Sequence, residues 1–521
     1  MTTRAARAFA RLATTADLLD RRHARRSSFA LTPGHPGALP AAWAVVRLSV
    51  VGAAVPLLAP LVGSLAIRNT AAVRALIDRY PELLAQVMAG EEHGYPADRV
   101  RRTPAAARYF VASDLHRCVP GTIDWPTHQN ARGLYELALD HYAAQDWHLV
   151  ENGDVEDYWL VGGSTYGVVY DLFRLAGHAL GPRRGAPLLR AVYREHLRRI
   201  VANNAGTYAR IEEGFHRQGR YHRLVGNHDD VYLDEAMVAA LGEVHEGIDV
   251  VDFLVFDADG DLDAGRDADR DAELDSPAGA GAGARAGEAV GIATHGHHVD
   301  GWNAPWRSGL GKLGTWLGSA LLDAPLVANP GMPAPSETDA LLGGHLPDVL
   351  TRVNRWLGAN LDLYSVDEVL LFDSFRAHAG VPVGAAVEGG PLLLLGHTHL
   401  PLSRPLEPAT RAAWERYYNS GAGIYWECVT GLEWDGTADP RHPEVRLVAW
   451  RYADRDEQTD PASVVGWDGD RAVVREVLDR VDPADTLAVV ASGPAPSRLF
   501  AGTARTPATP ASPSSTAEEA P

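Results

Sequence analysis

The stretch YFVASDLH (109–116) joins an apolar run to a short polar phrase, and the same pattern recurs as LLLLGHTH (392–399). Three further stretches follow it: WHLVENGD (147–154), HRLVGNHD (222–229) and VGIATHGHH (290–298). Short apolar runs of this kind are typical of buried strands. Because ligands in α/β folds bind at the carboxyl ends of strands, we expect the five polar phrases to meet at one edge of a sheet. The sequence therefore predicts an α/β fold.

The polar phrases contain the ligand types that two neighbouring divalent cations require, if one carboxylate bridges the two ions. Imidazole and carboxylate groups suit ions such as Zn, Mn and Fe, and the phrases contain no thiolate. Taken alone, a D-x-H, G-D or G-N-H phrase is usually a chance match or a turn. Five phrases in this order predict a metal centre with these candidate ligands: Asp114, His116, Asp154, Asn227, His295, His397 and His399.

The order and types of these residues resemble the calcineurin-like metallophosphoesterase family, whose pattern is D-x-H, G-D-x-x-[DE], G-N-H-[DE], H and G-H-x-H. The resemblance covers residues 108–450. It implies a four-layer α/β/β/α sandwich with helical insertions and two divalent ions, Mn, Fe or Zn, at the mouth of the two sheets. The implied ligand sets are Asp114, His116 and His399 for the first metal, Asn227, His295 and His397 for the second, and Asp154 as the bridge.

His228 directly follows a candidate ligand, and the resemblance implies a catalytic role for it without metal contact. Such a histidine stabilises the transition state or protonates the leaving group. The resemblance implies a hydrolase of phosphoric esters, in which a water shared by two metals attacks phosphorus in line. Three further residues are expected to contact the substrate or to orient the ligands by hydrogen bonds: His297, Asp157 and Asp229.

Within this family, GDVEDYW (153–159) is most similar to the UDP-diacylglucosamine pyrophosphohydrolases of lipid A synthesis. Their catalytic phrase is G-N-R-D, whereas this chain has His228, the residue of the general phosphoesterase pattern. The substrate therefore stays open between a phosphorylated small molecule and a lipid-linked phosphate. One alternative is a protein serine/threonine phosphatase, whose usual G-N-H-E is G-N-H-D here. Another is a catalytically silent scaffold of the same fold, against which the complete ligand set argues.

Composition restricts the class of partner and the compartment. The 521 residues carry a formal net charge of −19, which argues against a nucleic-acid partner because such surfaces need a basic stripe. With 46% hydrophobic and 22% charged residues, the chain has the composition of a globular protein. Two cysteines, Cys118 and Cys428, do not form a disulfide framework of the secreted type. The composition favours a cytoplasmic enzyme and leaves its oligomeric state open.

Residues 48–67, LSVVGAAVPLLAPLVGSLAI, contain no charged residue and are long enough to cross a bilayer. Pro56 and Pro60 interrupt this segment, and its Ala, Gly and Ser content makes it only moderately hydrophobic. We therefore expect an apolar arm packed on the catalytic domain. The alternative is a membrane association through residues 48–67, as a span or a surface anchor. An amphipathic helix is expected over residues 70–90.

The rest of the chain predicts one catalytic domain with insertions and irregular ends. Apolar residues at helical spacing predict helices over 131–145 and 187–215, and strands are expected at 417–423 and 445–452. The first predicted segments are a basic flexible N-terminal segment (1–40) and an apolar segment and helix that pack on or anchor the domain (41–107). The metallophosphoesterase domain follows (108–455), with an acidic loop (257–288) and a helical insertion that either caps the site or adds a layer (299–375). A C-terminal extension (456–492) and a disordered tail (493–521) come last.

Overall fold

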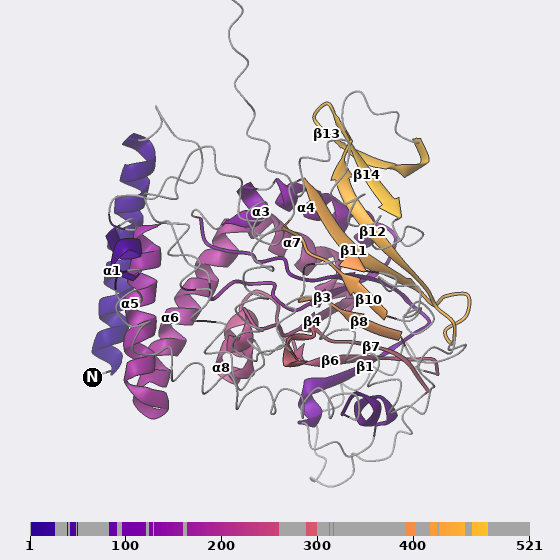
Figure 1. The fold of residues 1–521 in the computed structure, drawn as a ribbon, viewed down its shortest axis with the longest axis horizontal. Coiled ribbons are helices and arrows are strands. Elements are labelled where there is room, and N and C mark those ends of the chain that lie inside the picture. Colours follow the sequence, from indigo (N-terminus) through magenta and orange to yellow (C-terminus); the bar gives the residue numbers. More distant parts are fainter. Residues whose placement is uncertain are drawn as a thin grey trace, which may run out of the picture.

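Two β-sheets and a set of helices give the chain a mixed α/β architecture (Figure 1), as the sequence predicts. The computed structural model describes these residues: 2–26, 39, 42–47, 49, 83–90, 96–120, 124–128, 130–159, 164–259, 288–299, 312, 316, 392–397, 399, 401–402, 417–424, 427–453 and 461–477.

The larger sheet has eight strands in the order β13-β14-β12-β11-β2-β3-β4-β5. Strands β2 to β5 run parallel to one another, and the other neighbours pair antiparallel. The last two strands continue this sheet past residue 455, where the sequence suggested that the domain ends. The strands are β2 (Arg108–Ala112), β3 (His148–Asn152), β4 (Tyr221–Leu224), β5 (Val250–Val251), β11 (Cys428–Asp435), β12 (Glu444–Tyr452), β13 (Val464–Asp468) and β14 (Arg471–Val477).

The smaller sheet has six strands in the order β1-β6-β7-β8-β10-β9. Strands β7, β8 and β10 are parallel, so their carboxyl ends lie at the same edge. All five apolar runs identified in the sequence are strands, distributed over the two sheets. The strands of the smaller sheet are β1 (Val100–Pro104), β6 (Phe253–Asp257), β7 (Ala289–Ala293), β8 (Leu392–Leu395), β9 (Pro401–Leu402) and β10 (Tyr417–Ser420).

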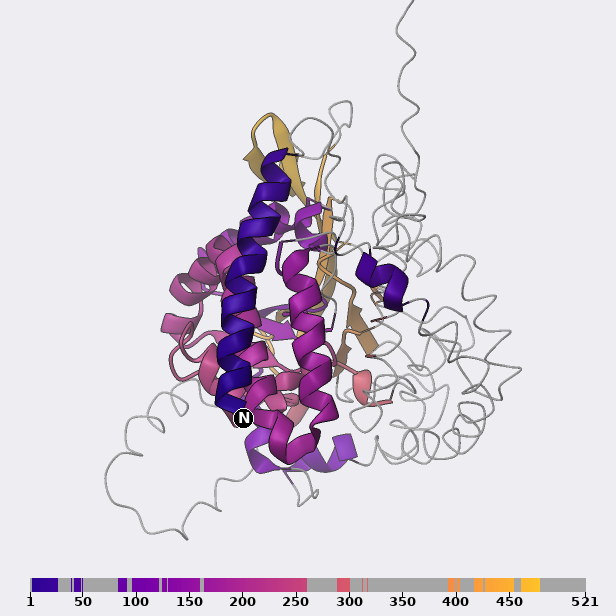
Figure 2. The same ribbon diagram turned by 90° about the vertical axis from the view of Figure 1, so that its left-hand side faces the viewer.

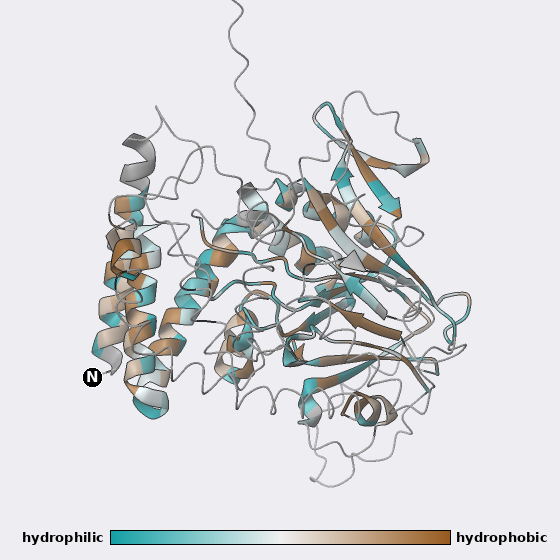
Figure 3. Ribbon diagram, viewed as in Figure 1, coloured by the Kyte–Doolittle hydropathy of each residue, from teal (hydrophilic) through white to brown (hydrophobic). Residues whose placement is uncertain are grey.

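The two sheets pack against each other through aromatic and aliphatic side chains. Alternate residues of a strand point to opposite faces, so Tyr109 and Val111 of β2 join the core shared with the smaller sheet. Across that core, the ring of Trp434 stacks on Phe256 with ring centroids 4.3 Å apart. Figure 3 shows hydrophobic residues concentrated in the central strands. Each buried aromatic side chain of this size stabilises the packing by a few kcal/mol, roughly 25 cal/mol per Å².

Helices cover the outer face of the larger sheet and extend to one side of it. Leu134 and Ala138 of α4 pack against Phe110 on the outer face. The predicted helices over 131–145 and 187–215 are present, the second as two helices separated at Asn204. The helices are α1 (Thr2–Arg26), α3 (Trp125–His128), α4 (Ala131–Ala143), α5 (Thr165–Ala179), α6 (Gly181–Asn203), α7 (Ala205–Gly214) and α8 (Glu235–Leu241), with 3-10 helices η1 (Ala97–Arg99), η2 (His216–Gln218), η3 (Asp230–Leu233), η4 (His297–Val299) and η6 (Pro461–Ser463).

The N-terminal segment differs from the prediction, because residues 2–26 form a helix rather than a flexible arm. Helix α1 lies beside α5 and α6 on the outside of the molecule (Figure 2). Phe9, Ala13 and Ala16 form its buried face at helical spacing, and the ring of Phe9 lies 5.3 Å from that of Phe173. The arginine-rich composition obscured this narrow apolar face in the sequence.

Several predicted segments lie largely outside the described residues. Apart from single or terminal positions, these are the apolar stretch 48–67, the acidic loop 257–288, the insertion 299–375 and the whole tail 493–521. Residues 83–89, within the helix expected over 70–90, are helical. Among the described helices, none has the length and apolar character needed to cross a bilayer.

Candidate metal centre

The candidate ligands follow the carboxyl ends of parallel strands in both sheets. Asp114, Asp154 and Asn227 come directly after β2, β3 and β4 of the larger sheet. His295 and His397 come directly after β7 and β8 of the smaller sheet. Because the sheets pack face to face, these loops meet where the two carboxyl edges come together.

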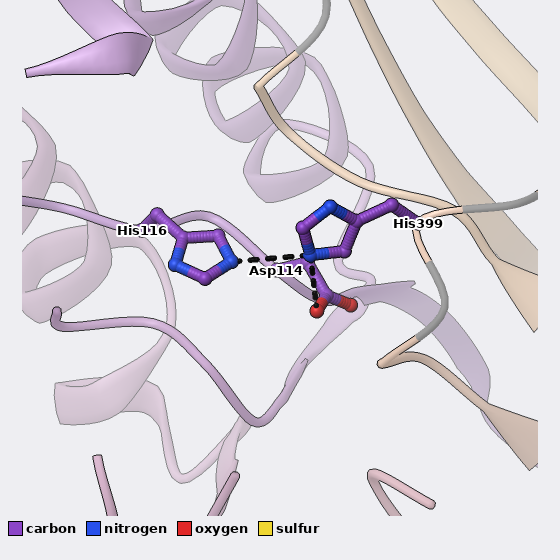
Figure 4. A group of neighbouring side chains, drawn as sticks. All are labelled: Asp114, His116 and His399. Atoms are coloured by element: carbon purple, nitrogen blue, oxygen red, sulfur yellow. Dashed lines mark hydrogen bonds and ion pairs between the residues drawn. The ribbon is translucent and has the colours of Figure 1, made fainter. Parts of the chain in front are cut away.

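The first ligand cluster consists of Asp114, His116 and His399 (Figure 4). His399 Nε2 lies 3.1 Å from Asp114 Oδ1 and 3.2 Å from His116 Nε2. Hydrogen bonds to the other carboxylate oxygen, Oδ2, come from Ser113 Oγ at 2.5 Å and from the backbone N–H of His397 at 2.9 Å. Oδ1 of Asp114 is therefore left to face His399, and the ligand atoms of the three residues lie within 4.8 Å of one another.

The second ligand cluster consists of Asp154, His295 and His397, whose ligand atoms all lie within 4.8 Å of one another. His295 Nε2 is 3.2 Å from Asp154 Oδ2. The same nitrogen is 3.9 Å from Asp114 Oδ1, so the two clusters adjoin. This arrangement brings the six histidines and aspartates expected from the sequence into two neighbouring sets of three.

Asn227 precedes His228 in the loop after β4 and carries a buried amide oxygen. Its Oδ1 is buried and has no hydrogen-bond partner among the described residues. The backbone N–H of the following residue, His228, donates to Asp154 Oδ1 at 2.7 Å, which holds the two loops together. A buried amide oxygen without a hydrogen-bond partner is costly unless it binds something, and a divalent cation is a suitable partner.

Hydrogen bonds on the far side of the rings orient two of the imidazoles. His295 Nδ1 lies 2.8 Å from the carbonyl oxygen of Asn152, which can only accept, so Nδ1 carries the proton. His116 Nδ1 lies 3.1 Å from Asp157 Oδ2. In both rings Nε2 is left to face the cluster as a lone-pair donor, as metal ligation requires.

His228 lies beside the first cluster, and its position is set by two neighbours. Its Nδ1 is 3.0 Å from Asp157 Oδ1, and its ring stacks on Trp159 with ring centroids 4.6 Å apart. The atoms of His116, Asp157 and His228 are also close enough to hold an ion. Each oxygen of Asp157 already contacts one imidazole, however, so its geometry is that of an orienting group. Trp159 was quoted in the sequence phrase, but nothing there indicated its stacking on His228.

The backbone of the ligand loops is in a conformation that L-residues rarely adopt. Eight described non-glycine residues have a positive φ, and five of them are candidate ligands. Left-handed conformations at aspartate and histidine carry a cost, so their concentration here indicates that the surrounding structure maintains them for a function. These residues and their φ values are Asp114 (52°), His116 (42°), Asp154 (52°), His397 (71°) and His399 (56°).

Glycines in two of the phrases permit the close approach of the loops. Gly153 has φ 81°, and a Cβ at this position would lie 2.6 Å from Cγ of His295. A Cβ on Gly226 would overlap the carboxylate of Asp154. Any larger residue at these positions would push the ligand loops apart.

The two ligand carboxylates are held ionised at the centre. Burial opposes the ionisation of Asp114, yet His295 and His399 lower its pKa to about 2. Burial likewise opposes the ionisation of Asp154, but His295 and His228 hold its pKa well below the usual range. Two buried carboxylates with low pKa values form a negative centre suited to cations.

Two histidines of the centre have raised pKa values. Burial by itself would lower the pKa of His295, but the carboxylates of Asp154 and Asp114 outweigh the effect of burial and raise this pKa to about 9. For His228, burial is similarly outweighed by Asp157 and then Asp154, which raise its pKa to about 9. In both cases the nearby carboxylates stabilise the protonated, positively charged imidazole.

A buried charge network lies beneath the ligand loops. Asp229 Oδ1 accepts from the backbone N–H of Gly226 at 2.6 Å, and its Oδ2 accepts from that of Val155 at 3.0 Å. Arg223 of β4 contacts Asp229 and, at 2.5 Å, Glu156. Asp229 thus ties the loops that carry two candidate ligands, as expected of an orienting residue. The sequence did not single out Arg223, because an arginine within a strand has no distinctive local pattern.

His297 lies next to the metal centre without joining either ligand cluster. Its ring centroid is 5.5 Å from that of His295 and 6.5 Å from that of His397. The residue is buried, and burial holds its pKa well below the usual range. His297 is therefore a neutral, buried imidazole beside the second cluster.

Comparison of the chain with protein-family models, with curated proteins and with solved structures found no match. The functional conclusion therefore depends on the residues of this chain and on their geometry.

Proposed function

We propose that the protein is a hydrolase of phosphoric esters that binds two divalent cations, of the calcineurin-like metallophosphoesterase type. The observation that carries this proposal is the pair of adjoining ligand clusters, each with one carboxylate and two imidazoles. Soft ligands are absent from both sets, which suits Mn, Fe or Zn. The burial of the Asn227 amide oxygen without a hydrogen-bond partner fits a further ligand of the same centre.

The residues divide between the two ions by proximity. Asp114, His116 and His399 would hold one ion, and Asn227, His295 and His397 the other. Asp154 would bridge them, because its carboxylate adjoins His295 of the second cluster and acts electrostatically on Asp114 of the first. Two such ions lower the pKa of bound water and stabilise the negative charge of a phosphoryl group during in-line displacement.

His228 would act on the substrate rather than bind an ion. Asp157 holds its Nδ1 and Trp159 packs against one face of its ring, so Nε2 is the nitrogen left for the substrate. From this position the imidazole would donate a hydrogen bond to a phosphoryl oxygen or to the leaving-group oxygen. Asp157 would position His116 and His228 together, which couples one metal ligand to the acid.

The complete four-layer α/β/β/α sandwich is part of this proposal. Two sheets and a helical layer over the larger one are described. A helical element also lies beside the smaller sheet, where Arg102 of β1 donates to the carbonyl oxygens of Val87 and Met88 at 3.3 and 3.0 Å. That contact supports helices on both sides of the paired sheets.

The proposal is tested by metal analysis together with a substrate panel. The purified protein should contain about two transition-metal ions per chain. With added manganese it should hydrolyse at least one of p-nitrophenyl phosphate, its bis ester, nucleotides, cyclic nucleotides, a phosphopeptide and a nucleoside-diphosphate lipid. A folded, metal-saturated sample that is inert toward all of them would instead support the scaffold alternative, and activity on the phosphopeptide alone would support the protein phosphatase.

Two substitutions separate metal binding from chemistry. Asp154→Asn removes the charge that both ions would share, so both metal content and activity should fall. His228→Ala should leave metal content unchanged and lower kcat by about 10²- to 10⁴-fold, the range for a positioned acid. The matched controls are Asp146→Asn and His442→Ala, which alter exposed residues of the same types. Loss of metal from the His228 variant would contradict the role proposed for it.

A further inference from the structure

Helix α1 has a charge opposite to that of the chain as a whole. Residues 2–26 contain seven arginines and two aspartates, in a chain with a net charge of −19. The helix lies at the outside of the molecule, away from the two sheets (Figures 1 and 2). A strongly basic element on an acidic protein indicates a local partner of negative charge.

Both aspartates of α1 point toward the protein and leave the outer face basic. Asp17 pairs with Arg199 of α6, with its Oδ2 2.8 Å from Nη2. Asp20 accepts hydrogen bonds from the backbone N–H groups of Thr165 and Tyr166, at 2.7 and 3.1 Å, at the first turn of α5. These contacts attach α1 to the helices behind it.

The outer face of α1 combines arginines with exposed leucines. Arg4, Arg7 and Arg11 are exposed at helical spacing. Leu18 continues their line with 64% of its surface exposed, while Leu12 and Leu19 form a second exposed line at 47% each. We call these six residues the basic-leucine face. Leucines exposed to this extent beside arginines indicate that the partner of α1 has a surface with both apolar and anionic groups.

The neighbouring helix α5 adds to the exposed apolar surface. Leu172 and Leu175 are 45% and 42% exposed, and α5 lies side by side with α1 in both views. A groove of about 480 Å³ also runs between α1, α6 and α8, with Ala6, Phe9 and Ala10 in its lining. Its lining also includes Glu195 and Glu243, each paired with an arginine of α6.

We propose that the basic-leucine face docks on an anionic lipid surface, with α1 parallel to the plane of the membrane. The arginines would contact the acidic headgroups, and the leucines would enter the boundary between headgroups and acyl chains. The phosphates of a nucleic acid would pair with the arginines, but they would offer no apolar contact to the leucines. A second copy docked face to face would set arginine against arginine. This surface contains none of residues 48–67, and its role is independent of the proposed hydrolase activity.

The test is co-sedimentation of the full chain with vesicles, which reads binding without any activity measurement. The protein should bind vesicles of phosphatidylcholine with phosphatidylserine, and binding to phosphatidylcholine alone should be much weaker. The triple variant Arg4→Gln, Arg7→Gln, Arg11→Gln should lower the partition coefficient on the order of 100-fold, from about a tenfold change per 1.4 kcal/mol and about 1 kcal/mol per arginine. High salt should weaken wild-type binding, because salt screens the headgroup charge.

A second variant tests the apolar part of the same face. Leu12→Gln with Leu19→Gln should lower the partition coefficient about tenfold or more, because two leucines no longer enter the lipid. The matched controls are the triple variant Arg217→Gln, Arg441→Gln, Arg446→Gln and the single variant Trp467→Gln, all outside α1; Arg446 is partly exposed and the other three residues are exposed. Both controls should bind as the wild type does. Circular dichroism of each variant establishes that α1 is retained.

Three outcomes would overturn the proposal. The wild type could fail to bind anionic vesicles at low salt. It could bind while both α1 variants bind equally well, which would assign the contact to another segment such as 48–67. It could self-associate through α1 in analytical ultracentrifugation without binding vesicles, which would make a second copy the occupant.

Discussion

Replacement of Arg223 by methionine removes a buried positive charge while keeping much of the side-chain volume. Arg223 is buried in β4, with Glu156 Oε2 2.5 Å from its Nη2, Asp229 on the same nitrogen and Glu151 Oε2 3.6 Å from Nη1. Burial opposes its charge, but Glu156 and Asp229 hold its pKa well above the usual value. The substitution therefore strands carboxylates that have little access to water.

The magnitude follows from these contacts. At an effective dielectric constant of about 20, opposite charges about 3 Å apart attract by roughly 5 kcal/mol. Desolvation offsets much of this attraction while the pair is intact. Without Arg223, Asp229 keeps among the described residues only hydrogen bonds from backbone N–H groups, and the cation then nearest to Glu156 is Arg117, with Nη1 3.9 Å from Oε1. Breaking a buried ion pair of this kind typically costs about 3–5 kcal/mol. For a chain of 521 residues, whose unfolding entropy is about 1 kcal/mol/K, such a loss corresponds to a fall in Tm of about 3–5 °C.

Thermal and urea unfolding at pH 8 would measure this loss. The control is Arg217→Met, which breaks the exposed pair with Glu212 (3.0 Å) and should cost less than about 1 kcal/mol. Adding Glu156→Gln to Arg223→Met should restore part of the lost stability, because it neutralises one of the stranded carboxylates. The double variant should then be more stable than the sum of the two single changes predicts.

If Arg223→Met loses no more stability than Arg217→Met, the charge of Arg223 is not needed to stabilise the buried carboxylates around it. Additivity of Arg223→Met and Glu156→Gln would refute the coupling between these two charges. Either result would mean that the network is hydrated or rearranges, and that it does not hold the loops of the metal centre.

Other predictions concern the metal centre and the response to acid. Asp157→Asn should lower metal affinity or kcat about 10- to 100-fold, read by metal titration and hydrolysis, whereas the exposed Asp146→Asn should not. Ser113→Ala removes the hydrogen bond to Asp114 and should weaken Mn²⁺ binding about tenfold in calorimetric titration of the metal-free protein; an unchanged Kd would contradict this role. Burial lowers the pKa of His196 to about 4 from the ordinary 6.5, so unfolding takes up a proton between these values. Stability contributed by the neutral His196 is complete above pH 6.5 and should fall by about 3 kcal/mol as the pH drops to 4. The variant His196→Gln should lose less stability than the wild type over that range in urea unfolding.

Local patterns were sufficient to predict the elements that build the centre. The apolar runs before Asp114, Asp154, Asn227, His295 and His397 are strands in the structure, as is residue range 445–452. These predictions succeeded because strands and helices bury residues at regular intervals, and this periodicity is visible as a pattern of apolar residues in the sequence. The helix over residues 2–26 was missed because its buried face is narrow and consists mostly of alanine.

Contacts between distant segments could not be read from the chain. The pairing of β1 with β6, the stacking of Trp159 on His228 and the contact of Arg223 with Glu156 join residues that are 67 or more positions apart. Each contact depends on how the sheets and helices pack, and this packing cannot be predicted from the local patterns of a single sequence.

Which residue types lie at the strand ends can be predicted from the chain alone, because a strand followed by a polar phrase is a local property. The sequence also supplied the full set of donor atoms: carboxylates, imidazoles and one amide. The tertiary structure decided the part that each donor takes. Asp154 and Asp157 stand three residues apart in one phrase, and both are buried. Asp154 has a φ of 52° and adjoins His295 in a ligand cluster, whereas Asp157 lies against Nδ1 of both His116 and His228. Asp154 meets a histidine from the smaller sheet, whereas both partners of Asp157 follow strands of the larger sheet, and these loops meet only in the folded chain.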